Sequence, residues 1–445
     1  MKKLISALVF LSACSASALD ISFERDTSLP VVQINVAIKT GAVSDPAGQL
    51  GITNFLGEML LRGTDKLSKE QIDLAVDQMG AQLGVETRSE ALIIRGAVLS
   101  SQLDRFLALI QELITHSTFP QEEIAKLQSV VESQILDEES SDQTLAGLKF
   151  TQFLFGSHPY GKPILGHTST VRGFTREMIL EHYHRLVTRD LLLIVGSGDT
   201  TDGWISNWAM GLSNALPEGD SSLTKVPVPE AVQKEKLLIV DKPGRTQTQI
   251  TGGQIGVQMT DPSFFPLYLG NHAFGGGSFS ARLMTEIRVK RGWSYGAYSY
   301  FKHSREPRSW QFYLFPAAKD TPAALELTLQ LVKDVQEHGI KADEFDFAQK
   351  SLVNSSGFMY NTSRKRVENK LMERTLGLPD GFMKSYGPRL QSVTLPEVNT
   401  ALHSFLHPDK LAIVVLATAK DLKAKIAKAA GLAESQIQVE PYNKE

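Results

Sequence analysis

The stretch LGITNFLGEMLLRGT, residues 50–64, is the most informative part of the chain. We expect it to form a helix on which Asn54 and Glu58, four residues apart, share one face. An amide oxygen is a weak, neutral ligand that cannot replace an imidazole nitrogen on zinc. Gly57 offers no general base, and a glycine inside a helix costs about 1 kcal/mol relative to alanine. The helix is therefore expected to lack the groups of a catalytic zinc site.

The same stretch resembles the zinc-binding helix of the pitrilysin/insulinase family of metallopeptidases, whose frame reads Gly-Leu-x-His-Phe-Leu-Glu-His-Met-Leu-x-x-Gly-Thr. In that inverted H-x-x-E-H motif the two histidines bind zinc, and the glutamate activates the metal-bound water. Here Asn54, Gly57 and Glu58 stand at those three positions. The resemblance implies a non-catalytic member of the short, processing-peptidase-like form, with a degenerate metal site.

The family takes its third zinc ligand, a glutamate, from a second helix further along the chain. By alignment with EEIAKLQSVVESQILDEES, residues 122–140, the matching position is Gln134. Glu132, Glu138 and Glu139 lie nearby, so a shift of one turn would bring in a carboxylate. Two acids and an amide suit magnesium or calcium better than zinc. We expect an empty site, with no metal or other cofactor in this chain.

Two other histidines are not expected to form a metal site. His182 and His184 are two residues apart on a predicted helix and therefore point to different faces.

Length and composition indicate a large globular protein. With 445 residues, 42% of them hydrophobic and 21% charged, the chain is too long for one core and suits two domains. A formal net charge of -3 without a Lys/Arg block gives no reason to expect nucleic acid or an anionic membrane surface as a partner. Cys14 is the only cysteine, so no intrachain disulfide can form.

Residues 1–18 have the composition of a secretory signal peptide. Lys2 and Lys3 precede an apolar run that is too short to span a bilayer. Ala-Ser-Ala at residues 16–18 fits ordinary signal peptidase, whereas Leu-Ser-Ala-Cys ending at Cys14 resembles a bacterial lipobox. Both interpretations predict a periplasmic protein, either soluble or anchored to the membrane by a lipid on Cys14.

Beyond the signal, the sequence consists of two weakly similar halves. The first opens with residues 31–51 and the second with residues 248–277, and each segment predicts a strand, an Asp-Pro turn and a helix. Residues 216–236 between the halves are polar and contain prolines, as a linker should. We therefore expect an N-terminal domain over residues 19–215 and a C-terminal domain over residues 237–445.

The family resemblance extends over nearly the whole mature chain. HPYGKPILG at residues 158–166, the segment 174–199 and GGGSFSARLMTEIRVKRGWSYGAYSYF at residues 275–301 resemble blocks found in this order in the family. The resemblance implies an α+β fold of two tandem, homologous α/β rolls. Each roll would be a mostly antiparallel sheet backed by helices, and together they would form half of a clamshell.

The last block contains a candidate substrate-binding pair. We expect a helix over residues 281–290, ended by Gly292 and followed by a strand from Trp293. Active members of the family place an arginine near this helix end and a tyrosine seven residues later, where the pair holds the substrate backbone and polarises the scissile carbonyl. Arg288 and Tyr295 match that pair in identity and spacing. An Arg fork and a phenol are suited to stabilising an oxyanion.

The resemblance also implies a peptide-binding strand. In the family an extended peptide adds to the edge of a first-domain strand, and the matching segment is residues 82–87. Gln82, Val85 and Thr87 mark this predicted strand, whose alternating pattern fits a half-buried position.

These features favour one function among those considered. A chain without metal ligands in its first half but with Arg288 and Tyr295 in its second resembles the complementing subunit of a two-chain zinc endopeptidase. The partner would carry an intact H-x-x-E-H motif and the zinc, and the periplasmic heterodimer would enclose and orient a peptide substrate. The alternative is a structural or peptide-binding pseudo-peptidase with no role in catalysis.

Overall fold

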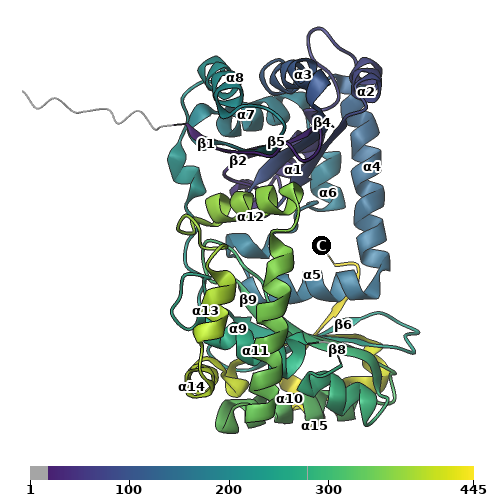
Figure 1. The fold of residues 1–445 in the computed structure, drawn as a ribbon. Coiled ribbons are helices and arrows are strands. Elements are labelled where there is room, and N and C mark those ends of the chain that lie inside the picture. Colours follow the sequence, from purple (N-terminus) through teal and green to yellow (C-terminus); the bar gives the residue numbers. More distant parts are fainter. Residues whose placement is uncertain (1–18, 278, 445) are drawn as a thin grey trace, which may run out of the picture.

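The computed structural model describes residues 19–277 and 279–444, so the predicted signal peptide and Cys14 lie outside it. Two β-sheets with their covering helices lie one above the other along the molecule (Figure 1). The first sheet has the order β1-β5-β2-β4-β3. Its strands are β1 Asp20–Arg25, β2 Val31–Ile38, β3 Gln82–Thr87, β4 Leu92–Leu99 and β5 Leu192–Gly198.

The second sheet repeats the topology of the first and adds one strand. Its order is β11-β6-β10-β7-β9-β8. In both sheets the first strand of the half runs parallel to its neighbour, β1 to β5 and β6 to β10, and the following pairs are antiparallel. The two mostly antiparallel rolls backed by helices are thus confirmed. The strands are β6 Lys236–Asp241, β7 Gln249–Ile255, β8 Ser294–Phe301, β9 Ser309–Pro316, β10 Ala412–Ala417 and β11 Ile437–Pro441.

Helices account for most of the remaining regular structure in the described part of the chain. Those of the first half are α1 Ile52–Met59, α2 Lys69–Gln78, α3 Leu103–Thr115, α4 Gln121–Ser140, α5 Asp142–Phe155, α6 Thr168–Arg172, α7 Arg176–Leu186 and α8 Asp202–Ala215. Those of the second half are α9 Phe264–Asn271, α10 Thr321–His338, α11 Ala342–Ser356, α12 Ser363–Leu376, α13 Tyr386–Ser392, α14 Leu395–Phe405 and α15 Ala419–Ala429. None of them combines the length and apolar character that a membrane span requires.

Strand alternation gives each sheet a core face. In β2, Val32, Ile34 and Val36 are fully buried against the apolar sides of α1, α3 and α7. The residues between them, Gln33 and Asn35, point to the opposite face and line a polar groove. Helix α1 packs on the core face, and its Gly57 is buried there.

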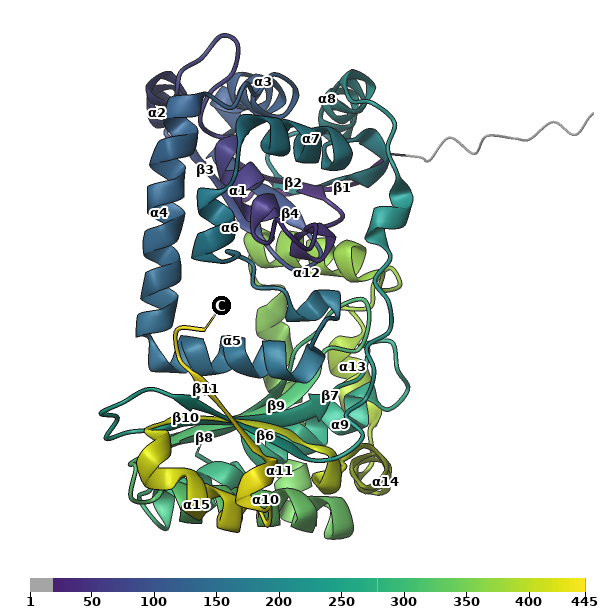
Figure 2. The same cartoon turned by 180° about the vertical axis from the view of Figure 1, so that it is seen from behind.

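Each half covers the second face of the other half's sheet with one of its helices. Helix α5 of the first half packs on β10 and β7, and α12 of the second half packs on β5 and β2 (Figures 1 and 2). Leu145 and Phe150 of α5 join the apolar face of the second sheet, while Val367 and Leu371 of α12 join that of the first. This exchange of helices ties the two halves together through buried apolar surface.

Candidate functional site

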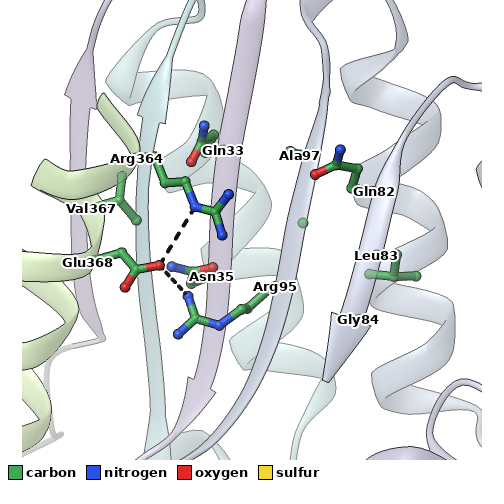
Figure 3. Close-up of a pocket in the computed structure, with 11 residues that line it drawn as sticks. Gln33, Asn35, Gln82, Leu83, Gly84, Arg95, Ala97, Arg364, Val367 and Glu368 are labelled. Carbon is green, nitrogen blue, oxygen red and sulfur yellow. Dashed lines mark hydrogen bonds and ion pairs between the residues drawn. The ribbon is translucent and has the colours of Figure 1, made fainter. Parts of the chain in front are cut away.

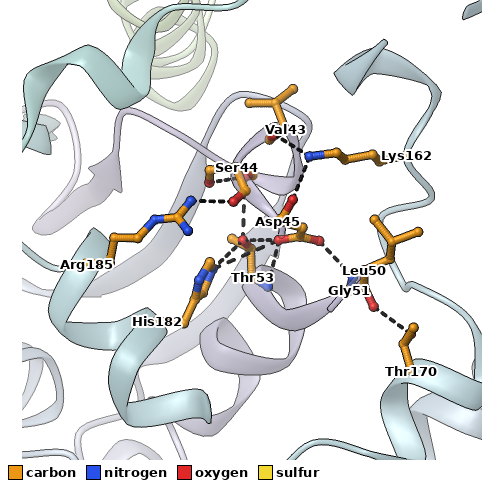
Figure 4. A network of polar contacts seen from close by, with 11 residues as sticks. Val43, Ser44, Asp45, Leu50, Gly51, Thr53, Lys162, Thr170, His182 and Arg185 are labelled. Carbon is orange, nitrogen blue, oxygen red and sulfur yellow. Dashed lines mark hydrogen bonds and ion pairs between the residues drawn. The ribbon is translucent and has the colours of Figure 1, made fainter. Parts of the chain in front are cut away.

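Helix α1 is held at its N-terminus by the carboxylate of Asp45, which precedes it in the Asp-Pro turn (Figure 4). Asp45 Oδ2 accepts a hydrogen bond from Gly51 N at 2.7 Å, and Oδ1 accepts one from Thr53 N at 3.1 Å. The Thr53 hydroxyl donates to Asp45 Oδ1 at 2.5 Å. A carboxylate at this place satisfies amide groups that the first helical turn leaves unpaired.

His182 of α7 completes this network. Its Nε2 lies 2.8 Å from Thr53 Oγ1, and because that hydroxyl donates to Asp45, the imidazole donates to it. His182 is buried whereas His184 is exposed, so the predicted separation of the two histidines is confirmed. Burial, followed by the nearby Arg185 charge, lowers the pKa of His182 to about 3. Burial raises the pKa of Asp45 to about 6, although its hydrogen bonds oppose the shift.

The two pKa shifts act on stability in opposite directions. The neutral His182 contributes stability that is fully present above pH 6.5 and is lost as the pH falls towards 3. The contribution of Asp45 is fully present below pH 3.8 and is lost as the pH rises through about 6. Between pH 3.8 and about 6, the two contributions to the pH dependence of the unfolding free energy largely cancel in the native protein.

In a His182→Gln variant, the pH dependence of the unfolding free energy should contain the contribution of Asp45 without that of His182. Glutamine keeps a polar partner for Thr53 but does not titrate. We expect the unfolding free energy of the native protein, relative to that of His182→Gln, to rise by up to about 1.4 kcal/mol per pH unit between pH 3 and 6.5. Urea unfolding at several pH values measures this difference. A difference that does not change with pH would contradict the assignment.

The positions that match the family's metal ligands lie on α1 and α4. Asn54 and Glu58 are half-buried on α1, and burial raises the pKa of Glu58 while Arg62 and Lys69 oppose the shift. Gln134 on α4 is exposed. Within the residues that the structure describes, no three His, Cys, Asp or Glu side chains come together as a metal site would require.

The neighbouring acids of α4 have other surroundings. Glu132 pairs with Arg172 at 2.9 Å. Burial raises the pKa of Glu138, and the backbone carbonyl of Glu139 accepts a hydrogen bond from Lys242 Nζ at 2.8 Å. Among the described residues these acids do not gather with enough other His, Cys, Asp or Glu side chains to make a group of three.

Gly57 packs tightly against side chains of the first sheet. A Cβ atom added to it would lie 2.5 Å from Leu92 Cδ1 and 2.8 Å from Val85 Cγ1. Both contacts are shorter than van der Waals packing allows, and the branched Val85 has little rotamer freedom. The side chains of β3 and β4 thus occupy the space into which a base at position 57 would have to extend.

Strand β3, which contains Gln82, Val85 and Thr87, is at the edge of the first sheet and pairs only with β4. Val85 packs against the first core, on the side of α1. One long edge of β3 is thus unpaired within the described chain, which is the geometry that strand addition uses. Because Val85 supports the core, a charge at this position would disturb folding as well as peptide binding.

A polar groove of about 270 Å³ lies beside this edge, on the face of the sheet that α12 partly covers (Figure 3). Arg95 on its floor pairs with Glu86 and, at 3.1 Å, with Glu368 of α12. Gly84 borders the groove, with nothing within 4 Å of the place where its side chain would be. The groove is therefore open next to β3, and its charges are mostly paired.

Arg288 and Tyr295 come together on the second sheet. The guanidinium of Arg288 lies over the Tyr295 ring, 4.1 Å from its centroid, and over the Phe279 ring at 4.7 Å. Both rings are largely exposed, Tyr295 by 73% and Phe279 by 58%. Stacking on two aromatic faces fixes the guanidinium plane and leaves its N–H edge free to donate.

Arg288 differs from the other basic residues around it. Lys290 and Arg291 both pair with Glu286, at 2.6 and 2.7 Å. Arg288 has no ion pair or side-chain hydrogen bond within residues 19–277 and 279–444. A cation that is held in place by aromatic rings, but has no carboxylate partner, is suited to an external oxygen.

The helix predicted over residues 281–290 is present, and the part that carries Arg288 is π-helical. The π-helical turn runs over Met284–Val289, with Lys290 N donating to Thr285 O at 3.0 Å, five residues back. Gly292, at φ 66°, ends the helix as predicted, and the strand begins at Ser294 instead of Trp293. π-Helical turns are rare and are frequent at functional sites.

The degenerate metal positions and the Arg288–Tyr295 pair do not meet within this chain. The first lie on α1 and α4 beside the first sheet, and the second lies at the edge of the second sheet (Figure 1). Sequence reasoning missed Phe279, Asp45 and the tight packing around Gly57. The sequence offered two signals for these features. They were Phe279, which precedes the helix of Arg288, and Gly57, a glycine inside a predicted helix.

Family models match most of the chain. A model described as insulinase, peptidase family M16, matches residues 21–168, and one described as the peptidase M16 inactive domain matches residues 173–352. A Helicobacter pylori protein named non-peptidase homolog YmxG is 23% identical over 398 residues, 89% of this chain and 91% of the relative. A Bacillus subtilis protein named uncharacterized zinc protease YmxG is 25% identical over 358 residues, 80% of this chain and 86% of the relative.

Solved structures share the fold. The peptidase M16 inactive domain from Pseudomonas fluorescens superposes with a TM-score of 0.83 at 23% identity, covering 89% of this chain and 94% of that one. The first half of the periplasmic protease PqqL from Escherichia coli superposes with a TM-score of 0.72 at 15% identity, covering 92% of this chain and 94% of that one. At these identities the likeness concerns the fold alone.

Proposed function

We propose, on the premise that this chain belongs to the insulinase (M16) peptidase family, that it is the non-catalytic subunit of a periplasmic zinc endopeptidase. A second family member with an intact H-x-x-E-H motif supplies the zinc and the catalytic base. This chain encloses the peptide and presents Arg288 to the carbonyl that the partner's zinc polarises. The periplasmic location is part of this proposal and is supported by the composition of residues 1–18, which is that of a secretory signal peptide.

The observation that carries this proposal is the contrast between the two candidate sites. At Gly57 the space for a general base is filled by Leu92 and Val85. At Arg288 a guanidinium that has no carboxylate partner among the described residues lies over two exposed rings. A protein with only a structural role has no need to keep an unpaired cation in a defined orientation, so the contrast favours a chain that contributes half of an active site.

The arrangement supports a specific chemical role. Guanidinium N–H groups form strong, short hydrogen bonds to oxygen atoms that carry negative charge. Attack of water on the scissile carbonyl develops negative charge on its oxygen, and Arg288 would stabilise that charge as a preoriented donor without reorganisation. The partner's zinc would supply the activation of that water. The Tyr295 hydroxyl, at the exposed edge of the pair, is a second donor for the substrate backbone.

Co-purification from the native cell tests the proposal. The tagged chain should bring down an M16 family member with the intact zinc motif, and the two should elute as a heterodimer in size-exclusion chromatography. A quenched peptide should be cleaved by the pair, with inhibition by a chelator, and by neither chain alone. Elution of this chain as a homo-oligomer, without such a partner and without peptidase activity, would favour the alternative of a structural or peptide-binding pseudo-peptidase.

A further inference from the structure

A second cavity, of about 360 Å³, lies where the two halves of the chain meet. Its lining comes from residues 88–91 between β3 and β4, from residues 302–308 between β8 and β9, and from the end of α12. It contains neither a residue of α1 nor Arg288. The apolar side of the cavity is formed by Ala91, Ile164, Met372 and Leu376.

The polar side contains nitrogen atoms without partners. Arg308 Nη1 donates to Ser89 Oγ at 2.8 Å and to Ser304 Oγ at 3.2 Å, whereas its Nε is buried without a hydrogen-bond partner in the described chain. Nδ1 of His303 is likewise buried and unpartnered. Buried polar atoms are nearly always hydrogen-bonded, so these two atoms mark a wall of the cavity whose hydrogen bonds are incomplete within the described chain.

Two cations of this cavity also lack a counterion. Neither Lys302 nor Arg308 makes an ion pair among the residues that the structure describes, whereas Arg88 is paired with Glu86. Burial, followed by repulsion from Arg308, lowers the pKa of Lys302 to about 8. An anion placed between the two side chains would remove this repulsion and favour the charged form of the lysine.

Glu90 is the carboxylate of the cavity lining, and its oxygens are already engaged. Oε1 accepts a hydrogen bond from the Tyr160 hydroxyl at 2.8 Å, and Oε2 accepts one from Arg305 N at 3.0 Å. The cations of the lining are Arg88, which is paired with Glu86, and Lys302 and Arg308, which share the cavity with the single carboxylate of Glu90. The resulting excess of positive charge favours an anionic ligand.

We propose that this junction cavity binds a small monocarboxylate with an apolar body. The carboxylate is held between Lys302 and Arg308, whose guanidinium forms strong, charge-assisted hydrogen bonds to carboxylates. The apolar body packs against Ile164, Met372 and Leu376. A cavity with an apolar wall and a few convergent polar groups is the usual form of a small-molecule site. Because both halves contribute to it, the bound ligand stabilises their junction.

Calorimetric titration of the full mature chain with octanoate tests this proposal, with octanol and inorganic phosphate as controls for the apolar and the anionic part alone. Octanoate should bind with a sub-millimolar Kd and raise the Tm, and neither control should do so. The acid and amide forms of a blocked dipeptide ending in leucine distinguish a free acid from a peptide C-terminus as the natural source. Binding of only the dipeptide acid would assign the same site to peptide ends.

Lys302→Met is the decisive variant, because it keeps the aliphatic stem and removes an ammonium group that has no partner in the described chain. It should weaken octanoate binding by about 10-fold or more, whereas Lys350→Met on the exposed side of α11 should not. Leu376→Trp fills the apolar side and should also abolish binding. Equal binding of octanol and octanoate, unchanged affinity in Lys302→Met, or no binding of either carboxylate would overturn the proposal.

Discussion

Replacing Arg288 by alanine should lower kcat of the reconstituted heterodimer by about 10²- to 10³-fold, which corresponds to roughly 3 to 4 kcal/mol of transition-state stabilisation. The effect should appear in kcat more than in KM, because the contact strengthens as charge develops on the oxygen. Removal of a merely exposed side chain changes stability by only a few tenths of a kcal/mol, so folding and assembly should be preserved. The measurement is cleavage of a quenched peptide, with assembly checked by size-exclusion chromatography.

The chain offers a matched control for this variant. Arg291 is also basic and lies three residues further on, but it is paired with Glu286. Arg291→Ala should leave turnover nearly unchanged. Tyr295→Phe keeps the ring beneath the guanidinium and removes only the hydroxyl, and Phe279→Ala removes one of the two stacking faces. Full activity in Arg288→Ala and Tyr295→Phe would leave this chain a scaffold.

The second large effect is expected at Gly57. Gly57→Ala places a methyl group 2.5 Å from Leu92 Cδ1 and 2.8 Å from Val85 Cγ1, so we expect a loss of about 1 to 3 kcal/mol in the free energy of unfolding. Gly147→Ala on α5 is the matched control, because nothing lies within 4 Å of its new methyl group. That variant should be neutral or up to about 1 kcal/mol more stable. Urea unfolding compares the two, and equal stabilities would refute the tight packing at Gly57.

Rebuilding the family's metal site should consequently fail. A variant with histidine at positions 54 and 58 and glutamate at 57 and 134 restores every ligand type but forces a long, charged side chain against Leu92. We expect poor folding and far less than one zinc per chain in metal analysis. One tightly bound zinc with chelator-sensitive peptide cleavage would show that the site had only lost its ligands and had kept its shape.

Local signals in the sequence were sufficient for the main elements. The alternating segments at residues 31–38 and 249–255 form strands β2 and β7, and the helices that follow them are α1 and α9. The two halves have only weak sequence similarity, but the repeated strand order of their sheets confirms that they share one topology. Alternation and Asp-Pro turns act over a few residues, which explains why they could be recognised without a structure.

Other features depended on contacts between distant segments. The exchange of α5 and α12 between the halves was not foreseen, because an apolar helix face does not indicate which sheet it will cover. The π-helical turn before Lys290 was also not predicted, because a helical pattern in the sequence does not distinguish an α turn from a π turn. Strand β11, which extends the second sheet, likewise went unpredicted.

The absence of the family's zinc-binding groups at these positions can be derived from residue identity, because no fold can give an imidazole to Asn54 or a carboxylate to Gly57. The sequence also shows the candidate pair directly, because Arg288 is followed by Tyr295 seven residues later. Three-dimensional packing decided the rest. It filled the space beside Gly57 with Leu92, brought the Phe279 ring to the Arg288 guanidinium, and assembled the cavity around Lys302 from both halves. The functional groups of a side chain are fixed by residue identity. The space around that side chain and the charges that pair with it depend on contacts between segments that are distant in the sequence.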